Sequence, residues 1–423
     1  MALGYPIHDY RLDNGLRVVV SPDHAAPVVA VNLWYDVGSK DEAKGKTGLA
    51  HLFEHLMFQG SANVGAGEHL AIVQANGGTA NATTWFDRTN YFETVPVGAL
   101  ELALWLEADR LGTLPVALTQ GNLDNQRDVV MEEKRQRYDN VPYGDVLEHL
   151  VALTFPAQHP YGHTTIGSMD DLRAATLGDV TDFFARHYAA DNAVLTLVGD
   201  VRPEQGLALA DRYLGALPAI GRPKRDHLVP LPRIQGAPTL DRTSAVPADA
   251  VYLAWRVPAH GSRALDALQV GLAILGDGLT SRLHQALVRP ELAEGAGASA
   301  IALIGGTSLG FAYARALPGV SISALEGAMI AEIAALASAG PTEAEVNRAI
   351  AQHEREWLSE LGQVTSRADA IGAFTTLHDD PELINTRIDA VSSLTPEDVQ
   401  RAVADYLGED HHATLRIARE EQK

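Results

Sequence analysis

A chain of 423 residues exceeds what one hydrophobic core usually serves, and 46% apolar with 21% charged residues is an ordinary globular balance that argues against disorder. Its 54 acidic and 33 basic residues give a formal net charge of −21, which argues against nucleic-acid binding, since the Lys and Arg residues do not cluster. With no cysteine, the chain has no disulfides or thiolate ligands, so any bound metal must use His, Asp or Glu.

The N-terminal segment MALGYPIHDYRLDNGLRVVV lacks a basic stretch followed by an apolar core and a small-residue cleavage site, so we expect a cytoplasmic protein. A leader already removed would leave the same sequence and would place the protein in the periplasm. No apolar run approaches the roughly 18 residues of a membrane-spanning helix, so we expect no membrane insertion. We attribute the acidity to solubility; the alternative is an acidic chamber that attracts basic peptides.

The first hundred or so residues alternate between strand and helix patterns. A tight turn at Asn14-Gly15 precedes the β-branched run Val18 to Val20, and a second strand runs from about Val28 to Val37. A helix is predicted from about Lys46. The Thr-rich and aromatic segment TANATTWFDRTNYFETV predicts a further hairpin, and long helical patterns follow it.

The segment GLAHLFEHLMFQGS, residues 48–61, contains the main catalytic candidates. On a helix, His51 and His55 lie on one face, one turn apart, and Glu54 lies beside them. The neighbouring residues are apolar, so burying two imidazoles and a carboxylate there is costly unless they are paired or metal-bound. We therefore predict that His51 and His55 bind Zn²⁺ and that Glu54 activates water. The alternative is two core histidines that bind backbone carbonyls, beside an unrelated Glu.

Catalytic zinc commonly takes three protein ligands and one water, so a third ligand is required. The helix predicted over residues 123–140, LDNQRDVVMEEKRQRYDN, offers adjacent carboxylates. Helical spacing places Glu133 on one stripe with Leu123 and Val130, whereas Glu132 shares its face with charged residues. We therefore assign Glu133 as the ligand and Glu132 as a solvated neighbour. The alternative is that Glu133 pairs with an arginine of the same helix.

A second histidine-containing segment, HPYGHTTIGSMDDL, occupies residues 159–172 and precedes a predicted helix start at Ser168. Its spacing fits loop capping better than a metal site. We therefore interpret His163 as a structural residue.

The stretch 217–239 is dense in Pro, Gly and basic residues, and we interpret it as a linker. On either side the pattern recurs, since TLGDVTDFFARHYAADNAVLTLVGDV resembles TPEDVQRAVADYLGEDHHATLRIARE. We infer an α+β fold of two homologous domains, residues 1–216 and 240–423, each a mainly antiparallel sheet with helices covering one face. The alternative is a coincidence between two ordinary helix–strand units.

The chain resembles the pitrilysin-type inverted zinc peptidases of family M16 in HLFEH and its context, in NATTWFDRTNYFETVP, in QRDVVMEEKRQRYDNVPYG and in the two-domain repeat. The likeness spans nearly the whole chain and is generic in the second domain. It implies a third ligand nearly eighty residues after the motif in a V-x-x-x-E context, which Val129 and Glu133 match. Some relatives carry a further Glu where this chain has Gln126.

The resemblance also implies that a peptide substrate binds as an added strand along a sheet edge. The matching stretch runs from Ala80 to Thr84, with Asn81, Ala82 and Thr83 as the substrate-binding residues. The alternative is an ordinary Thr-rich strand that binds no ligand.

In the family, the second domain contributes an Arg and, seven residues later, a Tyr that hold the substrate carbonyl. In LHQALVRPELAEGAGASA, Arg289 matches the Arg, but Ala296 stands at the Tyr position, with Tyr313 as the alternative if the register slips. Losing one such donor can cost roughly 3 kcal/mol of transition-state stabilisation. We therefore expect a heterodimer in which this chain is one half of a clamshell and a homologous subunit without zinc supplies the Arg-Tyr pair.

The resemblance implies a zinc metallopeptidase that cleaves short or unfolded peptides. The alternative is a non-catalytic structural or assembly subunit of a larger complex. The complete set His51, Glu54, His55 and Glu133 favours the enzyme, since a structural subunit need not retain it. A peptidase that removes targeting presequences differs only in substrate.

Overall fold

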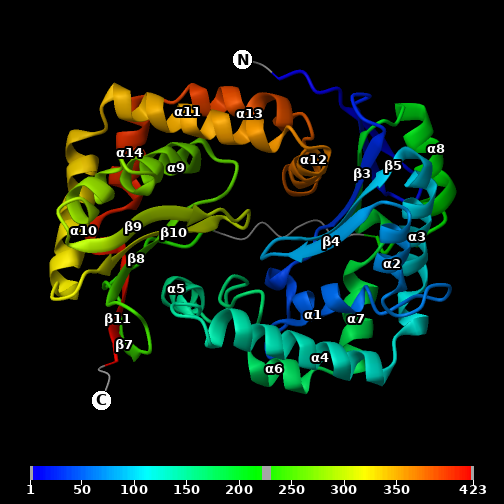
Figure 1. Ribbon diagram of the computed structural model, residues 1–423, viewed down its shortest axis with the longest axis horizontal. Helices are drawn as coiled ribbons and strands as arrows, with labels where there is room; N and C mark the ends of the chain where they lie inside the picture. Colours follow the sequence, from blue (N-terminus) through cyan, green and yellow to red (C-terminus); the bar gives the residue numbers. More distant parts are fainter. Residues whose placement is uncertain (1–2, 222–229, 421–423) are drawn as a thin grey trace. The chain divides into compact units, whose positions relative to one another are not determined.

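The computed structural model describes residues 3–221 and 230–420, which form two compact units with one β-sheet each (Figure 1). Among these residues, the first unit comprises 3–135, 163–221 and 357–388, and the second comprises 136–162, 230–356 and 389–420. Each unit is therefore assembled from three separate stretches of chain.

The first sheet has six strands in the order β1-β2-β6-β3-β5-β4. Only β2 and β6 are parallel neighbours; the other neighbouring pairs are antiparallel. The predicted Asn14-Gly15 turn is confirmed, with Gly15 at φ +88° between β1 and β2. The strands are β1 (His8–Arg11), β2 (Arg17–Pro22), β3 (Val28–Tyr35), β4 (Thr79–Thr84), β5 (Thr89–Pro96) and β6 (Ala193–Gly199).

Both faces of the first sheet are covered because its central strands are apolar on both sides. Val19 packs with Ile371 and Phe374 of α12, whereas the adjacent Val20 lies against Gly206 of α8 on the opposite face. The helices of this unit are α1 (Leu49–Leu56), α2 (Glu68–Ala75), α3 (Leu100–Ala117), α4 (Gln120–Lys134), α6 (Met169–Ala174), α7 (Leu177–His187), α8 (Pro203–Leu214) and α12 (Val364–His378).

The second sheet has five strands in the order β7-β11-β8-β10-β9, with β7 and β11 parallel. One face packs on α9, α10 and α14, while Arg256 of β8 points to the other face and donates to the Thr154 carbonyl at the end of α5. The strands are β7 (Thr239–Ser244), β8 (Ala250–Pro258), β9 (Ala293–Ile301), β10 (Thr307–Ala316) and β11 (Ala413–Arg419). The helices are α5 (Val146–Thr154), α9 (Arg263–Gly276), α10 (Ile322–Ala339) and α14 (Pro396–Tyr406).

The chain crosses between the units within two further helices, α11 (Glu343–Glu360) and α13 (Leu383–Ser392). Short 3-10 and π turns complete the described structure. They are η1 (Ser39–Asp41), η2 (Val97–Ala99), η3 (Arg135–Asp139), η4 (Ala190–Asn192), η5 (His284–Val288) and η6 (Glu409–His411).

The two sheets share one topology, in which β2-β6-β3-β5-β4 corresponds to β7-β11-β8-β10-β9. The final strand of each follows a helix that begins with a reciprocal Thr–Asp capping box, Thr176 with Asp179 in α7 and Thr395 with Asp398 in α14. The predicted fold class, two homologous α+β units with mainly antiparallel sheets and covering helices, is confirmed. The helices α12 and α5 add a second cover that the sequence patterns did not indicate.

The unit boundaries differ from the division into residues 1–216, 217–239 and 240–423. Helix α12 belongs to the first unit, because its apolar face packs on the first sheet. The segment that contains α5 belongs to the second unit, because it packs on the second sheet. Composition locates a break in the chain but not which sheet a helix covers. Residues 222–229 of the predicted linker lie outside the described residues, and its described parts contain no helix or strand before β7.

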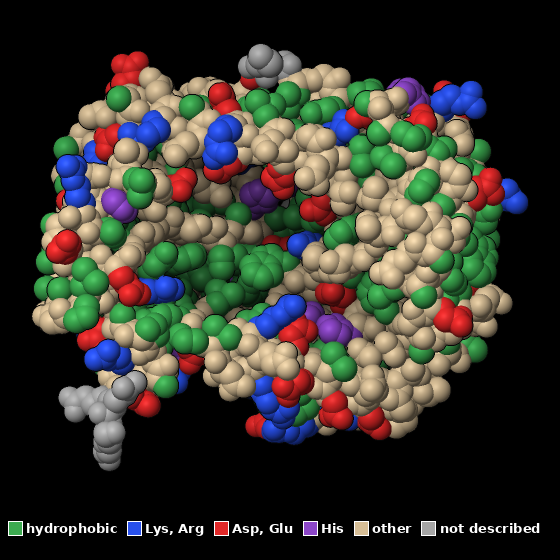
Figure 2. Space-filling model, viewed as in Figure 1, with side chains coloured by type: hydrophobic (Ala, Val, Ile, Leu, Met, Phe, Trp, Pro, Cys, Tyr) green, Lys and Arg blue, Asp and Glu red, His purple; other side chains and the backbone are tan. Residues whose placement is uncertain are grey.

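Helix α10 is long and apolar enough to cross a membrane by length and composition, so the prediction that no segment reaches this length was wrong. Its Leu325, Met329, Ile333 and Leu336 lie in the core of the second unit, and a core helix passes the same test. On the face shown in Figure 2, the Lys and Arg side chains of the described residues are interspersed with Asp and Glu rather than gathered in one field.

Candidate functional site

Helix α1 carries the HLFEH segment, and a buried carboxylate holds its first turn. Gly48 precedes the helix at φ +89°, and a Cβ there would lie 2.8 Å from the Ile166 carbonyl oxygen, so both conformation and space require glycine. Glu42 accepts hydrogen bonds from the N–H groups of Gly48 at 2.9 Å and Ala50 at 2.7 Å. These bonds satisfy two helix N–H groups that would otherwise have no acceptor.

His163 completes this cap, with Nε2 lying 2.8 Å from Glu42 Oε2 and 3.0 Å from the Ser39 carbonyl oxygen. Burial raises the pKa of the Glu42 carboxyl, and the contact with His163 opposes that rise. The structure therefore places His163 beside Glu42 near the start of α1, as a structural residue and not among the proposed ligands. Glu42 could not be identified from the sequence, because an acidic residue six positions before a glycine is a weak signal.

The structure brings His51, His55 and Glu133 together. Their ligand atoms lie within 4.8 Å of one another, with Glu133 Oε2 at 3.8 Å from His51 Nε2 and 3.5 Å from His55 Nε2. The two imidazole rings are nearly perpendicular, at 81°, with centroids 4.9 Å apart. Ligand atoms about 2.0–2.1 Å from a tetrahedral zinc ion lie about 3.3 Å from one another. The two distances to Glu133 exceed this spacing by about half an ångström or less, so the carboxylate lies close to each imidazole at nearly the separation that a shared zinc ion requires.

The face of α4 explains which of its two adjacent carboxylates turns inward. Leu123 and Val130 are fully buried, and Glu133 follows them on the same side. Glu132 is half exposed and accepts a hydrogen bond from Arg135 at 3.0 Å. Gln126 is also buried on this face, and its amide donates to Asn125 Oδ1 at 2.9 Å. An uncharged side chain therefore stands where some relatives are expected to carry a carboxylate.

Glu54 lies on α1, between the two histidines in the sequence. Figure 1 shows α1 next to β4. Its Oε2 accepts a hydrogen bond from the Thr84 hydroxyl at 2.5 Å. Burial raises the pKa of the Glu54 carboxyl, while Thr84, His55 and Arg88 act in the opposite direction. A carboxylate whose proton affinity is raised is suited to accept a proton from water. Thr84 lies at the end of the predicted substrate strand, but its bond to Glu54 was not predicted.

The predicted substrate-binding residues Asn81, Ala82 and Thr83 lie on β4, which is the edge strand of the first sheet. An edge strand has one side of its backbone available to pair with an extended peptide. In the second unit, Arg289 is exposed and donates to Gln285 at 3.0 Å. Tyr313 pairs with Gly297 across β10 and β9.

Tyr313 also stacks on Tyr252, with ring centroids 5.7 Å apart. The Tyr313 ring therefore has a packing partner within the second sheet. Ala296, which stands at the expected Tyr position, pairs with Ala314 within that sheet.

A second cluster of potential ligands was not predicted. His69 Nε2 lies 2.9 Å from Glu93 Oε1, and the Glu107 carboxylate accepts hydrogen bonds from Arg110, all four groups being buried. Burial raises the pKa of Glu107 to about 8 and lowers that of His69 to about 3. Because the Arg110 guanidinium already supplies a cation to these carboxylates, the cluster has little need of a metal ion.

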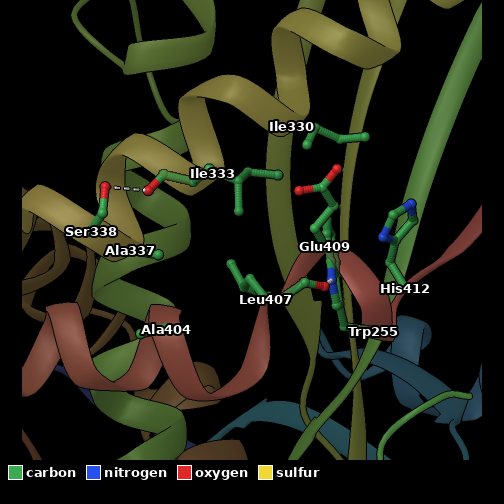
Figure 3. A pocket seen from close by; sticks show the side chains of 11 residues that line it. Trp255, Ile330, Ile333, Ala337, Ser338, Ala404, Leu407, Glu409 and His412 are labelled. Carbon is green, nitrogen blue, oxygen red and sulfur yellow. Dashed lines mark hydrogen bonds between the residues drawn. The ribbon is translucent and has the colours of Figure 1, made fainter.

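A cavity of about 290 Å³ lies in the second unit between β8, α10 and α14 (Figure 3). Figure 3 shows Ile330, Ile333 and Leu407 facing it beside Trp255, whose Nε1–H donates to the Gly408 carbonyl at 3.3 Å. Its lining is mostly apolar and contains neither of the two ligand clusters found in the described residues. We therefore place the candidate chemistry at His51, His55 and Glu133.

Known proteins with similar sequence and structure indicate the family of this chain. The family model for insulinase (peptidase family M16) matches residues 17–168, and that for the peptidase M16 inactive domain matches residues 174–353. The zinc protease PqqE of Helicobacter pylori is 33% identical over 378 residues, which cover 87% of this chain and 83% of that protein. The crystal structure of a protease from Helicobacter pylori has a TM-score of 0.91 at 29% identity, covering 98% of this chain and 99% of that one.

A relative with a different name is subunit 1 of the mitochondrial cytochrome b-c1 complex of Homo sapiens. It is 30% identical over 268 residues, which cover 63% of this chain and 54% of that subunit. Both family models and the extended match to PqqE lead to the same assignment. The chain belongs to peptidase family M16.

Proposed function

We propose that this chain is a zinc-dependent peptidase in which His51, His55 and Glu133 hold the metal and Glu54 is the general base. The observation that carries the proposal is the convergence of three ligand atoms within 4.8 Å of one another, from two helices, with Glu54 beside them. Two neutral imidazoles and one carboxylate form a ligand set used by catalytic zinc, which leaves a fourth position open.

When bound there, Zn²⁺ supplies a Lewis acid that polarises the scissile carbonyl and acidifies water. Glu54 accepts the proton from the attacking water and then delivers it to the leaving amine nitrogen as general acid. The exposed edge of β4 orients the peptide by backbone pairing, with Asn81, Ala82 and Thr83 along it. Backbone pairing favours short or unfolded peptides, because a folded substrate rarely offers a free strand.

We propose further that full activity requires a homologous subunit that contributes an Arg-Tyr pair. Ala296 offers no hydrogen-bond donor in its side chain, and Tyr313 is packed on Tyr252 within the second sheet. On this proposal the phenol donor to the substrate carbonyl comes from the homologous subunit, with which the chain forms a heterodimeric clamshell.

The second candidate function is that of a non-catalytic assembly subunit. The similarity to subunit 1 of the cytochrome b-c1 complex supports it, since that relative bears the name of a component of a larger complex. The complete ligand set with Glu54 favours the peptidase.

Metal analysis combined with peptide cleavage separates the two functions. We expect the wild type to bind one zinc ion, Glu133→Gln to lose most of it, and Glu54→Gln to retain zinc without cleaving peptides. A matched control is Glu132→Gln, which alters the exposed neighbour on the same helix and should change neither property. Unchanged cleavage by Glu54→Gln would remove Glu54 from its role, and full cleavage by the purified chain alone would remove the requirement for a partner.

A further inference from the structure

Thr84 is the last residue of the edge strand β4, and its side chain bonds to Glu54 on α1. Its hydroxyl donates to Glu54 Oε2 at 2.5 Å. The bond joins a hydroxyl to a mostly buried carboxylate, and charge-assisted bonds of this kind are about twice as strong as neutral ones.

This bond determines which oxygen of Glu54 is available. The terminal torsion of a glutamate is broad and roughly two-fold, so an unrestrained carboxylate samples many orientations. With Oε2 held by Thr84, rotation is restricted and Oε1 is left to accept a proton. A base that must receive a proton from water at a fixed position benefits from such a restraint, since catalysis depends on alignment.

The end of β4 is itself held in place, so Thr84 is a firm support. Arg88 Nη1 donates to the Thr83 carbonyl at 2.9 Å and to Asn90 Oδ1 at 3.1 Å. The guanidinium also lies 5.1 Å from the centre of the Trp34 ring, a cation–π contact. Thr83 and Asn90 are paired across β4 and β5. Arg88 therefore fastens the residue before Thr84 to the neighbouring strand.

We propose that Thr84 is a positioning residue for Glu54 and links the base to the strand along which a peptide would pair. The inference rests on the proposed function, because it assigns a support to the residue proposed as general base. It predicts a defect in turnover when the hydroxyl is lost, with little change in substrate binding. A merely structural role would instead lower stability and leave turnover unchanged.

The test compares Thr84→Val, which keeps the shape but removes the donor, with Thr84→Ser, which restores a hydroxyl. Thr243→Val removes a hydroxyl from an exposed position of β7 in the second sheet, away from the proposed site, and serves as the matched control. Each zinc-loaded variant, with the homologous subunit where the wild type requires it, is assayed with the internally quenched nonapeptide that the wild type cleaves fastest. Thr84→Ala is made in parallel in case the Val variant does not fold.

We expect kcat of Thr84→Val to fall roughly 10- to 100-fold with KM and zinc content unchanged. Thr84→Ser should recover most of the loss, and Thr243→Val should match the wild type. A kcat within two-fold of the wild type in both Thr84→Val and Thr84→Ala would overturn the inference.

Crystal structures of the metal-free wild type and Thr84→Val provide a readout that does not depend on catalysis. The Glu54 carboxylate should adopt a different orientation in Thr84→Val than in the wild type. An unchanged orientation would contradict the inference. If the wild type cleaves no peptide, the proposed function fails, and these structures alone decide whether Thr84 positions Glu54.

Discussion

The cap on α1, the helix proposed to bind the metal, gives the most quantitative test of the fold around the site. The Glu42 side chain is fully buried and accepts hydrogen bonds from two N–H groups at the start of α1. It also contacts the imidazole of His163. A hydrogen bond to a charged group contributes about 1.5–3 kcal/mol, so losing two of them predicts a destabilisation of about 3–6 kcal/mol for Glu42→Ala. Glu42→Gln keeps one acceptor oxygen and should lose about half as much.

Zinc affinity should decrease as well, because His51 is the third residue of α1 and a frayed first turn would no longer orient it. Substitutions of residues that support metal ligands typically lower affinity about 10- to 100-fold. Urea unfolding of the metal-free chain measures the first effect, and competition for zinc with a chelator measures the second. Glu132→Ala, an exposed carboxylate on α4, is the control and should change stability by less than about 1 kcal/mol. A Glu42→Ala variant as stable as this control would show that packing alone holds α1.

Two further predictions concern groups outside the metal-binding set. Burial raises the pKa of Glu107 to about 8, so between its unfolded value and pH 8 the folded state binds the extra proton and stability falls as pH rises. Below about pH 6.5 the low pKa of His69 gives the opposite slope, so the loss appears between about pH 6.5 and 8; unfolding at those two values should show a smaller loss in Glu107→Gln than in the wild type. Asp369→Ala, which leaves side-chain donors of Asn32, Trp34 and Asn90 without their shared acceptor, should cost about 3 kcal/mol in urea unfolding. A loss no greater than that of the exposed Asp379→Ala would contradict it.

The candidate ligands were predictable because the signals that identify them are local. His51 and His55 need only one helical turn to share a face, and the burial of Leu123 and Val130 on α4 follows the same periodicity that selected Glu133. Even so, periodicity alone did not show that the two helices meet. The resemblance to a peptidase family supplied that expectation, and the distances around Glu133 agree with it.

The supports of the site were not predictable, because each depends on residues far apart in the chain. His163 and Glu42 are 121 residues apart, and Asp369 and Asn90 are 279 apart. The sequence around each of these residues does not indicate its partner, because the hydrogen-bond partner of a buried polar side chain is set by the tertiary packing. For the same reason, the bond from Thr84 to Glu54 appears only when β4 and α1 are placed together.

The contribution of α12 shows that the first 216 residues do not make a complete unit. Ile371 and Phe374 cover one face of the first sheet, and Asp369 accepts a hydrogen bond from Asn90 at 2.8 Å. Asn90 in turn accepts from Arg88, which holds the end of β4 next to Thr84. Helix α12, which follows four strands of the second sheet in the sequence, therefore supports β4, the strand that contacts Glu54. Because the support comes from the C-terminal half of the chain, the position of β4 beside α1 depends on residues far from the HLFEH segment.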